Sequence, residues 1–292
     1  MQTQSSFKTT TTGKLYLVPT PIGNLGDMTY RAVETLKAVQ LIAAEDTRNT
    51  QKLLNHFEIE TKQISFHEHN TQQRIDELLV KLENGDDIAQ VSDAGMPSIS
   101  DPGHELVKAC IEANIAVVPL PGANAGLTGL IASGVLPQPF TFFGFLPRKG
   151  KELTETVTQL ALKPETTIFY EAPHRLKKTL QALIVDFEPE RQVTLCREIT
   201  KKFEEFIRGT LQEVLDWATT TEVRGEFVII VAGNPDPQAM TAVQETVTLS
   251  LAEQVEAQIQ QGASPNMAIK TVAKANNLKK QVVYNDYHEL TE

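Results

Sequence analysis

Short apolar segments alternate with longer amphipathic segments over the first 120 residues. Apolar runs of about four residues suit strands buried in a sheet, and apolar residues spaced by three and four predict helices. The expected strands are residues 15–18, 41–44, 64–66, 88–91 and 116–119, with a helix after each of the first four. Strands that alternate with helices predict a mostly parallel sheet that is covered on both faces.

The pattern continues differently after residue 120. A small-residue helix is expected to open at 121–125, and the proline-rich segment 134–139 suits a crossing into a second domain. The closer spacing of the next strands predicts a second α/β layer with some antiparallel pairing. We expect strands at 141–145, 167–170, 193–196, 205–207 and 227–231, with helices after 152 and at 174–187.

After a linker at 234–237, the last stretch has only helical periodicity and is similar to a small helix–turn–helix unit. The expected organisation is therefore a disordered leader (1–13), two α/β domains (14–122 and 123–235) and a helical module (246–292).

One connection, residues 92–103, is long for a loop between a strand and a helix. Such loops usually have about 2–6 residues, so its length favours a function. Ligands of open α/β sheets bind at the carboxyl ends of strands, and Gly95 lets a ligand approach the backbone closely. At the end of the loop, Asp101 is expected to cap a helix that begins at Pro102.

Four loops follow predicted strands of the first sheet and should meet at one edge: 19–26, 45–48, 92–97 and 121–125. Residues 170–175 follow a strand of the second domain in the same way. Polar groups that converge at a domain junction are typical of a ligand site.

Composition narrows the class of protein. Hydrophobic residues make up 41% of the 292 positions, and no apolar run reaches the roughly 20 residues of a membrane-spanning helix. The polar start of the chain lacks the apolar core of a signal peptide. Cys110 and Cys196 lack metal-ligand spacing, so we expect no metal, no disulfide and a reduced, cytoplasmic setting.

The formal net charge of −10 argues against nucleic-acid binding through global charge. Basic residues nevertheless cluster at 148–151, at 197–202, and in the tail, where no acid occurs between Ser264 and Asn285. Three such clusters favour a side of the molecule that faces phosphates. Neither a Gly-x-Gly-x-x-Gly fingerprint after a strand nor a P-loop is present, so the small-residue loops do not indicate phosphate cradling.

Charged residues at two predicted helix starts are candidates for chemistry. Asp46 suits a helix cap and a functional group equally well, whereas Arg48 suits a substrate contact or an ion pair. Arg175 opposes the dipole of the helix that it opens, which indicates an anionic partner or a buried pair with Glu171.

Five motifs, taken in order, resemble the tetrapyrrole methylase superfamily, and within it the branch that modifies ribosomal RNA. They are VPTPIGNL (18–25), AEDTR (44–48), SDAGMP (92–97), PGANA (121–125) and YEAPHR (170–175). The resemblance implies two α/β domains with a cleft for S-adenosyl-L-methionine between them, and a homodimer. It implies methylation of the ribose 2′-hydroxyl of a cytidine in the decoding region of 16S rRNA. Superfamily members that act on tetrapyrroles usually carry Gly-Gly-Asp-Pro where this chain has Ala94-Gly95-Met96-Pro97.

The resemblance also assigns residues by motif. Those expected to line the cofactor are Pro21, Asp93, Ala94, Gly95, Ile99, Ala123, Asn124, Tyr170, Ala172, Pro173, Gly225 and Glu226. For catalysis we expect Asp46 or Glu171 as the base, and Arg48, Arg175 or Arg197 to hold phosphate or stabilise an alkoxide. The residues expected to contact RNA are Arg148, Lys149, Arg175, Arg197, Lys201, Lys202, Lys270 and Lys274.

Two alternatives remain open at this point. A methyltransferase acting on a tetrapyrrole carbon would share the fold and cofactor but would not need the basic tail. A non-enzymatic nucleic-acid adaptor would bind through the tail without cofactor affinity. The acidic net charge is reconciled with an RNA substrate if that substrate is the assembled 30S particle rather than naked RNA.

Overall fold

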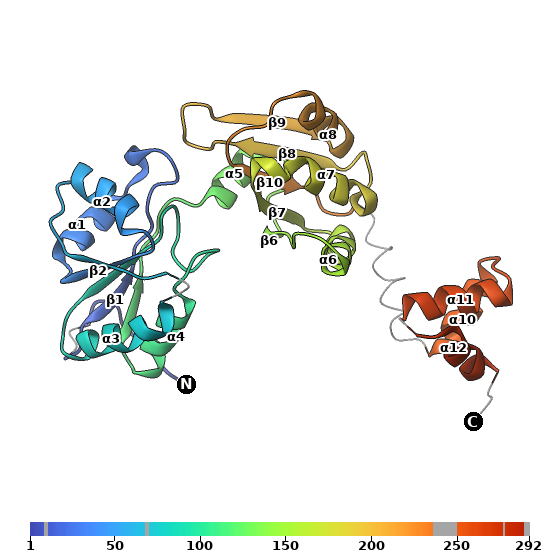
Figure 1. Ribbon diagram of the computed structural model, residues 1–292, viewed down its shortest axis with the longest axis horizontal. Helices are drawn as coiled ribbons and strands as arrows, with labels where there is room; N and C mark the ends of the chain where they lie inside the picture. The colour runs from blue at the N-terminus through green and yellow to red at the C-terminus, as the bar shows by residue number, and fades with distance from the viewer. Residues whose placement is uncertain (9–10, 68–69, 236–249, 277, 289–292) are drawn as a thin grey trace. The chain divides into compact units, whose positions relative to one another are not determined.

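The computed structural model describes residues 1–8, 11–67, 70–235, 250–276 and 278–288 (Figure 1). The chain divides into two compact units. The larger comprises residues 1–161 and 165–233, and the smaller comprises 162–164 and 234–292. Part of the expected linker, 236–237, lies outside the described residues.

The first sheet of the larger unit is entirely parallel, as the sequence predicted. Its order is β3-β2-β4-β1-β5. The strands are β1 (Lys14–Leu17), β2 (Leu41–Ala44), β3 (Gln63–Ser65), β4 (Ile88–Val91) and β5 (Ala116–Pro119). Every residue of β2 and β4 is buried, which explains why these segments are apolar on both faces, with Gln90 as the exception, rather than alternating.

Helices cover both faces of this sheet (Figure 1). One apolar cluster joins the strands to α1 (Tyr30–Ala38) and α2 (Thr47–His56). Another joins the opposite face to α3 (Thr71–Glu83) and α4 (His104–Glu112). The short 3-10 helix η1 (Leu25–Asp27) lies in the loop after β1. Because all strands run in the same direction, their carboxyl ends and the loops that follow lie along one edge.

The second sheet mixes parallel and antiparallel pairs, which confirms the expectation from strand spacing. Its order is β6-β7-β10-β8-β9, and only β6 and β7 pair in parallel. The strands are β6 (Phe140–Phe145), β7 (Thr166–Glu171), β8 (Gln192–Arg197), β9 (Glu205–Thr210) and β10 (Phe227–Val231).

The two faces of the second sheet are covered unequally. The helices α6 (Lys151–Ala161), α7 (Pro173–Phe187) and α8 (Leu211–Thr220) share a large apolar cluster with one face. On the other face, Leu130 of α5 (Ala125–Ser133) packs against Ile168, Cys196 and Ile230. A single short helix leaves part of this face open to line a pocket.

The smaller unit contains α10 (Leu251–Gln260), α11 (Pro265–Ala275) and α12 (Lys280–Tyr287), which confirms its helical character. Its own core includes Val255, Ile269 and Val283. The exact domain boundaries remain predictions, as does the disordered leader, in which Gln4 forms two hydrogen bonds with the Val117 backbone, at 2.7 and 2.9 Å.

The expectation that Asp101 caps the next helix is wrong. Helix α4 begins at His104, and Gly103 is its N-cap residue. The buried Gln90 side chain donates from Nε2 to the Pro102 carbonyl at 2.8 Å and holds this segment against β4. Before it, Ser98 and Ser100 have φ values of 69° and 63°, a region that non-glycine residues rarely adopt. The helix therefore begins after these turns, at His104.

Gly103 should be intolerant of a side chain. At its φ of 143°, a Cβ atom would lie 1.9 Å from Gln90 Nε2 and 2.4 Å from Ser98 Oγ. We expect Gly103→Ala to lower the free energy of unfolding by about 2–4 kcal/mol, measured by urea denaturation.

Gly134→Ala is the matched control. Gly134 has a φ of 83° but no atom within 4 Å of its Cβ position, so only backbone strain of about 1 kcal/mol should appear. Equal losses in the two variants would contradict the packing that we describe around Gly103.

Candidate functional site

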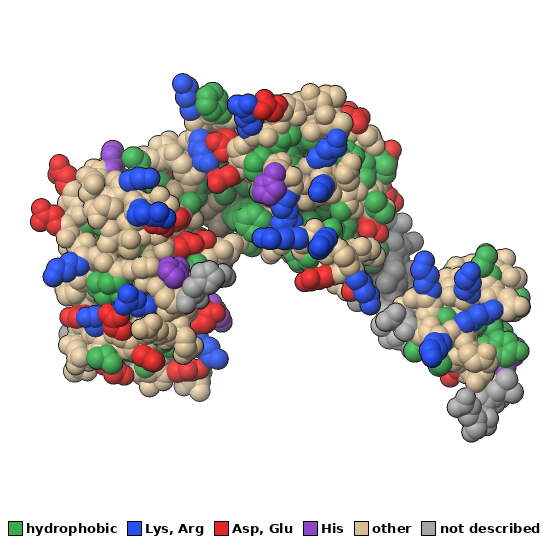
Figure 2. Space-filling model, viewed as in Figure 1, with side chains coloured by type: hydrophobic (Ala, Val, Ile, Leu, Met, Phe, Trp, Pro, Cys, Tyr) green, Lys and Arg blue, Asp and Glu red, His purple; other side chains and the backbone are tan. Residues whose placement is uncertain are grey.

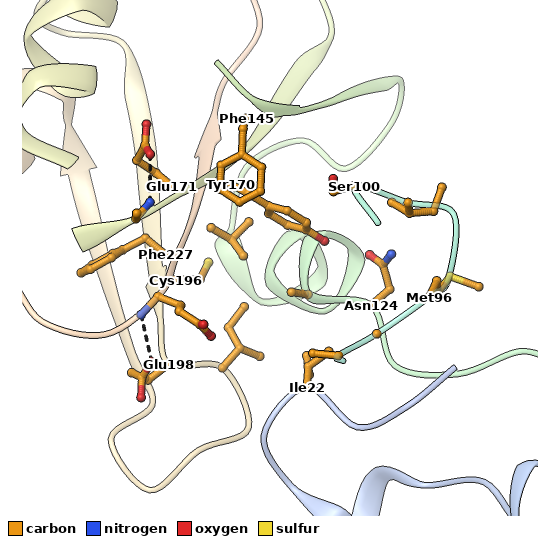
Figure 3. A pocket seen from close by; sticks show the side chains of 18 of the residues that line it. Ile22, Met96, Ser100, Asn124, Phe145, Tyr170, Glu171, Cys196, Glu198 and Phe227 are labelled. Atoms are coloured by element: carbon orange, nitrogen blue, oxygen red, sulfur yellow. Dashed lines mark hydrogen bonds between the residues drawn. The ribbon is translucent and has the colours of Figure 1, made fainter. Parts of the chain in front are cut away.

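A cavity of about 440 Å³ lies between the loops at the edge of the first sheet and the partly open face of the second (Figure 3). Ile22 and Met96 line it from loops of the first sheet, and Asn124 lines it from the start of α5. Tyr170 and Cys196 line it from the second sheet. Its size is that of a small-molecule site.

The first-sheet wall is held by a pair of backbone hydrogen bonds. Thr20 N donates to Gly95 O at 2.9 Å, and Gly95 N donates to Thr20 O at 3.0 Å. The buried Thr20 hydroxyl also donates to the Ser92 carbonyl at 3.1 Å. Because β1 and β4 are neighbours, their loops leave the sheet side by side, and these bonds join them into one wall.

The second wall follows from the two-residue period of strands. Phe169, Leu195 and Ile229 face the core under the helices α6, α7 and α8. Their neighbours Tyr170, Cys196 and Val228 point to the opposite face and line the cavity. The Tyr170 hydroxyl accepts a hydrogen bond from Gly126 N at 3.1 Å, and burial raises the pKa of Tyr170, so it remains a neutral hydroxyl.

The charges that line this cavity are mostly negative. Among the described lining residues, the four acids are Asp101, Glu171, Glu198 and Glu226, and the one cation is Lys201. The Tyr170 and Phe145 rings lie nearby and contact each other edge to face. An acidic cavity with aromatic rings suits a ligand that carries a positive charge and an aromatic or apolar body.

Glu171 is fully engaged by its surroundings. It is 3% exposed, and its Oε2 accepts from the Thr179 hydroxyl at 2.5 Å. Its Oε1 accepts from Ala172 N at 2.8 Å and pairs with Arg175 Nε at 3.3 Å. The expected pair of Arg175 with Glu171 is therefore present, and it ties the end of β7 to the first turn of α7.

Lys201 links the two remaining glutamates. Its Nζ lies 3.0 Å from Glu198 Oε1 and 2.7 Å from Glu226 Oε2. Glu198 Oε1 also accepts from Glu226 N at 2.9 Å (Figure 3). The loop before Lys201 is bent sharply, with φ values of 51° at Glu198 and 68° at Thr200. Glu198 and Lys201 both lie at the cavity wall.

Asp101 is the remaining acid. It is partly buried, and it forms a hydrogen bond with the Ser92 side chain. Burial, together with the negative charges of Glu45 and Asp93, raises the pKa of Asp101 to about 7. A carboxyl group in this state exchanges its proton near neutral pH.

The comparisons with known proteins decide the family. The family model of the tetrapyrrole (corrin/porphyrin) methylases matches residues 14–215. The chain belongs to the tetrapyrrole methylase family. It is 55% identical to "ribosomal RNA small subunit methyltransferase I" of Streptococcus pyogenes serotype M1, over 99% of this chain and 100% of that protein. It is 52% identical to the Bacillus subtilis (strain 168) protein of the same name, over 94% of each chain.

Solved structures agree in fold. A cobalt precorrin-4 methyltransferase matches with a TM-score of 0.59 and 16% identity, covering 75% of this chain and 94% of its own. A Thermus thermophilus uroporphyrin-III C-methyltransferase complexed with S-adenyl homocysteine has a TM-score of 0.54 and 18% identity, covering 75% and 97%. The fold class and the S-adenosylmethionine cofactor expected from the sequence are therefore confirmed for this methylase.

The cavity fits such a donor. The sulfonium of S-adenosylmethionine is a cation, and the acids of this cavity outnumber its one lysine. The side chains of Ile22, Met96 and Val228 offer apolar surface for the uncharged parts. At Gly95, the φ of 80° is one that residues with a side chain rarely adopt, which explains why glycine occupies this position of the wall.

The structure brings most of the expected cofactor residues together. Those that line the cavity are Ala94, Gly95, Ile99, Asn124, Tyr170, Ala172, Pro173 and Glu226. Pro21 and Asp93 instead line a smaller pocket of about 220 Å³ on the first domain. Ala123 and Gly225 line neither pocket, although each is next in sequence to a residue that lines the cavity. The binding roles of all these residues remain predictions.

Of the three residues expected to act in catalysis, only Glu171 lines the cavity. Asp46 caps α2 and pairs with Arg48 at 2.6 Å. Its backbone N–H donates to Asp93 Oδ1 at 3.2 Å. The hydrogen bond from Arg48 lowers the pKa of Asp46 to about 2, so this carboxylate has little affinity for a proton at neutral pH.

The residues expected to contact RNA separate into paired and exposed groups. Arg197 is paired with Glu205 at 3.1 Å and donates to Arg224 O at 2.7 Å. Arg175 and Lys201 are paired at the cavity, as described above. The exposed members are Arg148, Lys149, Lys202, Lys270 and Lys274.

Sequence reasoning missed Glu198 and Asp101 as cavity residues. Glu198 lies inside a run that was interpreted as a basic cluster, and the positive φ values that turn its side chain inward have no sequence signature. For Asp101 a signal was present, because it ends the same loop as Gly95.

The raised pKa of Asp101 predicts a pH-dependent cost to stability. The unfolded chain loses this proton near pH 4 and the folded protein near pH 7, so the folded state becomes less stable as pH rises between these values. We expect Asp101→Asn to be more stable than the wild type above pH 7, by about 1–2 kcal/mol because solvent screens this partly exposed carboxyl, and equally stable at pH 4. Urea denaturation across this range measures the difference. Asp76→Asn, on the exposed face of α3, is the control. A gain that is independent of pH would show that the pKa is not raised.

Lys201 and Lys202 form a matched pair for testing roles. Lys201→Ala leaves the mostly buried Glu198 carboxylate without its cation, whereas Glu226 is exposed, so we expect a loss of about 1–2 kcal/mol in unfolding free energy. The exposed Lys202→Ala should stay within about 0.5 kcal/mol. Thermal unfolding at one pH measures both, and indistinguishable variants would contradict a structural role for Lys201.

Proposed function

We propose that this methylase transfers a methyl group from S-adenosylmethionine to the ribose 2′-hydroxyl of a cytidine in the decoding region of 16S rRNA. The observation that carries the proposal is the 55% identity, over the full length, to a relative named ribosomal RNA small subunit methyltransferase I. The solved tetrapyrrole methyltransferases cover only 75% of the chain.

The donor is expected to occupy the cavity. Asn124 and Glu226 offer hydrogen-bond partners there, and Ile99 and Tyr170 offer apolar surface. When bound, S-adenosylmethionine supplies an activated methyl group on sulfur. The protein's contribution is to hold the acceptor oxygen in line with it, and positioning of this kind supplies about 7–11 kcal/mol in favourable cases.

The helical module is proposed to contact the RNA. Its lysines Lys270, Lys274, Lys279 and Lys280 are all exposed, and Figure 2 shows Lys and Arg side chains gathered on its visible face. Because the module has its own apolar core, these charges are free to face phosphates. Local contacts of this kind are compatible with a net charge of −10 if the substrate is the assembled 30S particle.

Two further expectations belong to this proposal: a homodimer and action in the cytoplasm, where ribosomes assemble. Among the described residues, no helix has the length and apolar character that a membrane span requires. The competing function, methylation of a tetrapyrrole carbon, is favoured by the fold of the solved neighbours. Met96, which stands where tetrapyrrole-specific members usually carry an acid, favours the RNA substrate.

Mass spectrometry of 16S rRNA tests the function directly. We expect rRNA from cells that lack this gene to have lost one ribose methyl group in a decoding-region cytidine, and the purified protein to restore it on 30S particles from those cells. As the control, protein-free 16S rRNA should be modified more slowly than the particle.

Two results would count against the proposal. An unchanged methylation pattern would remove the RNA substrate, and turnover of a tetrapyrrole by the purified protein would then favour the competing function. Equal rates on naked rRNA and on 30S particles would remove the particle as the substrate.

A further inference from the structure

We infer that Asp101 is the catalytic base that takes the proton from the acceptor hydroxyl. This inference rests on the proposed function, because it needs a hydroxyl as the methyl acceptor. It assigns a role to a residue that the sequence pattern had placed at a helix cap.

The other acids of the cavity are already engaged. Glu171 has three partners, including Arg175, and is almost entirely buried. Glu198 and Glu226 share Lys201. Among the described residues that line the cavity, Asp101 is the one acid without an ion-pair partner. A carboxylate that is free of a cation keeps its affinity for a proton.

The fold holds Asp101 at the wall. The Gln90 amide fixes the Pro102 carbonyl just after it, and the Ser98 and Ser100 turns fix the chain just before it. The groups that influence its charge are Glu45 and Asp93 from loops of the first sheet, the Ser92 side chain, which forms a hydrogen bond with it, and Tyr170 from the second sheet. Glu45 and Asp93 are anions, and Ser92 and Tyr170 carry no positive charge. None of these four groups therefore stabilises the ionised form of Asp101 by a positive charge.

This environment matches the task of a general base. A base works best when its pKa lies near the working pH, because it must be ionised and still bind a proton well. The pKa of Asp101, raised to about 7, meets this condition. The pKa of Asp46, lowered to about 2 by Arg48, does not.

The step balances with the cofactor as the only co-reactant. Asp101 accepts the hydroxyl proton as the ribose oxygen forms a bond to the methyl carbon. The bond between sulfur and that carbon breaks, and its electron pair stays on sulfur. The products are a methyl ether, the neutral thioether S-adenosylhomocysteine and a neutral Asp101 carboxyl, which returns its proton to water.

Asp101→Asn is the primary test, measured on 30S particles that lack the methyl group. We expect its turnover rate to fall by about 100-fold or more, which is the usual contribution of a general base. Affinity for S-adenosylmethionine, measured by calorimetry, should change by less than about threefold. The wild-type rate should rise with pH to a plateau above about 7, and the residual rate of the variant should lose this dependence.

Two comparison variants sharpen the result. Asp101→Glu keeps a carboxylate and should recover part of the activity with an altered pH profile. Asp76→Asn makes the same change of charge on the exposed face of α3 and should leave the rate unchanged. A ¹³C-NMR titration of the Asp101 carboxyl in the ligand-free protein, with Asp101→Asn for assignment, should show a midpoint near neutral pH.

Several outcomes would overturn the inference. Activity of Asp101→Asn within about threefold of wild type, while wild type methylates the particle, would remove Asp101 as the base and leave the proposed function intact. Loss of cofactor affinity in parallel with activity would make Asp101 a binding residue instead. A wild type that methylates no rRNA would overturn the proposed function, and this inference with it.

Discussion

Two hydrogen bonds between Thr20 and Gly95 hold together the wall on which the site depends. They are possible because β1 and β4 are adjacent and parallel, so that the loops after them start at the same edge about 75 residues apart in the chain. Asp93 continues this wall to the start of α2 by accepting a hydrogen bond from the Asp46 backbone. A lost hydrogen bond here would therefore displace residues of the large cavity and of the smaller pocket together.

Electrostatics gives the same site its chemical character. Burying several carboxylates close together is unfavourable unless cations, hydrogen bonds or protons compensate. Glu171 is compensated by Arg175 and Thr179, Glu198 by Lys201, and Asp101 by retaining its proton up to about pH 7, whereas Glu226, which also pairs with Lys201, is exposed to solvent. A cationic methyl donor would add further compensation. Asp101 therefore lowers the stability of the folded protein as the pH rises. Such a loss is expected at a site whose residues serve binding and proton transfer rather than stability.

The pattern of apolar and polar residues was sufficient to predict the features that depend on burial and on the direction of the strands. It predicted the strands of the first sheet, their parallel pairing, the antiparallel pairs of the second sheet and the helical end of the chain. It also offered a buried pair with Glu171 as one of two explanations for Arg175 at a helix start, the other being an anionic partner, and this pair is present. It misplaced Asp101, because the Gln90 side chain, eleven residues earlier, holds the Pro102 carbonyl, and the helix begins at His104, two residues later than the cap signal suggests. It interpreted Lys201 as an RNA contact, because a run of basic residues does not reveal that Glu198 and Glu226 converge on it.

By itself, then, the sequence determined the alternation of strands and helices, the edge at which the loops meet and, through five motifs, the methylase family. These features depend on the spacing of apolar residues and on the residues at turns, and both are local properties of the sequence. Only the tertiary structure decided which carboxylates are neutralised and which remain available, since that depends on residues far apart in the chain, such as Glu198 and Glu226, which are 28 positions apart. Charge, burial and proton affinity are properties of packed neighbours, and a linear pattern does not contain them.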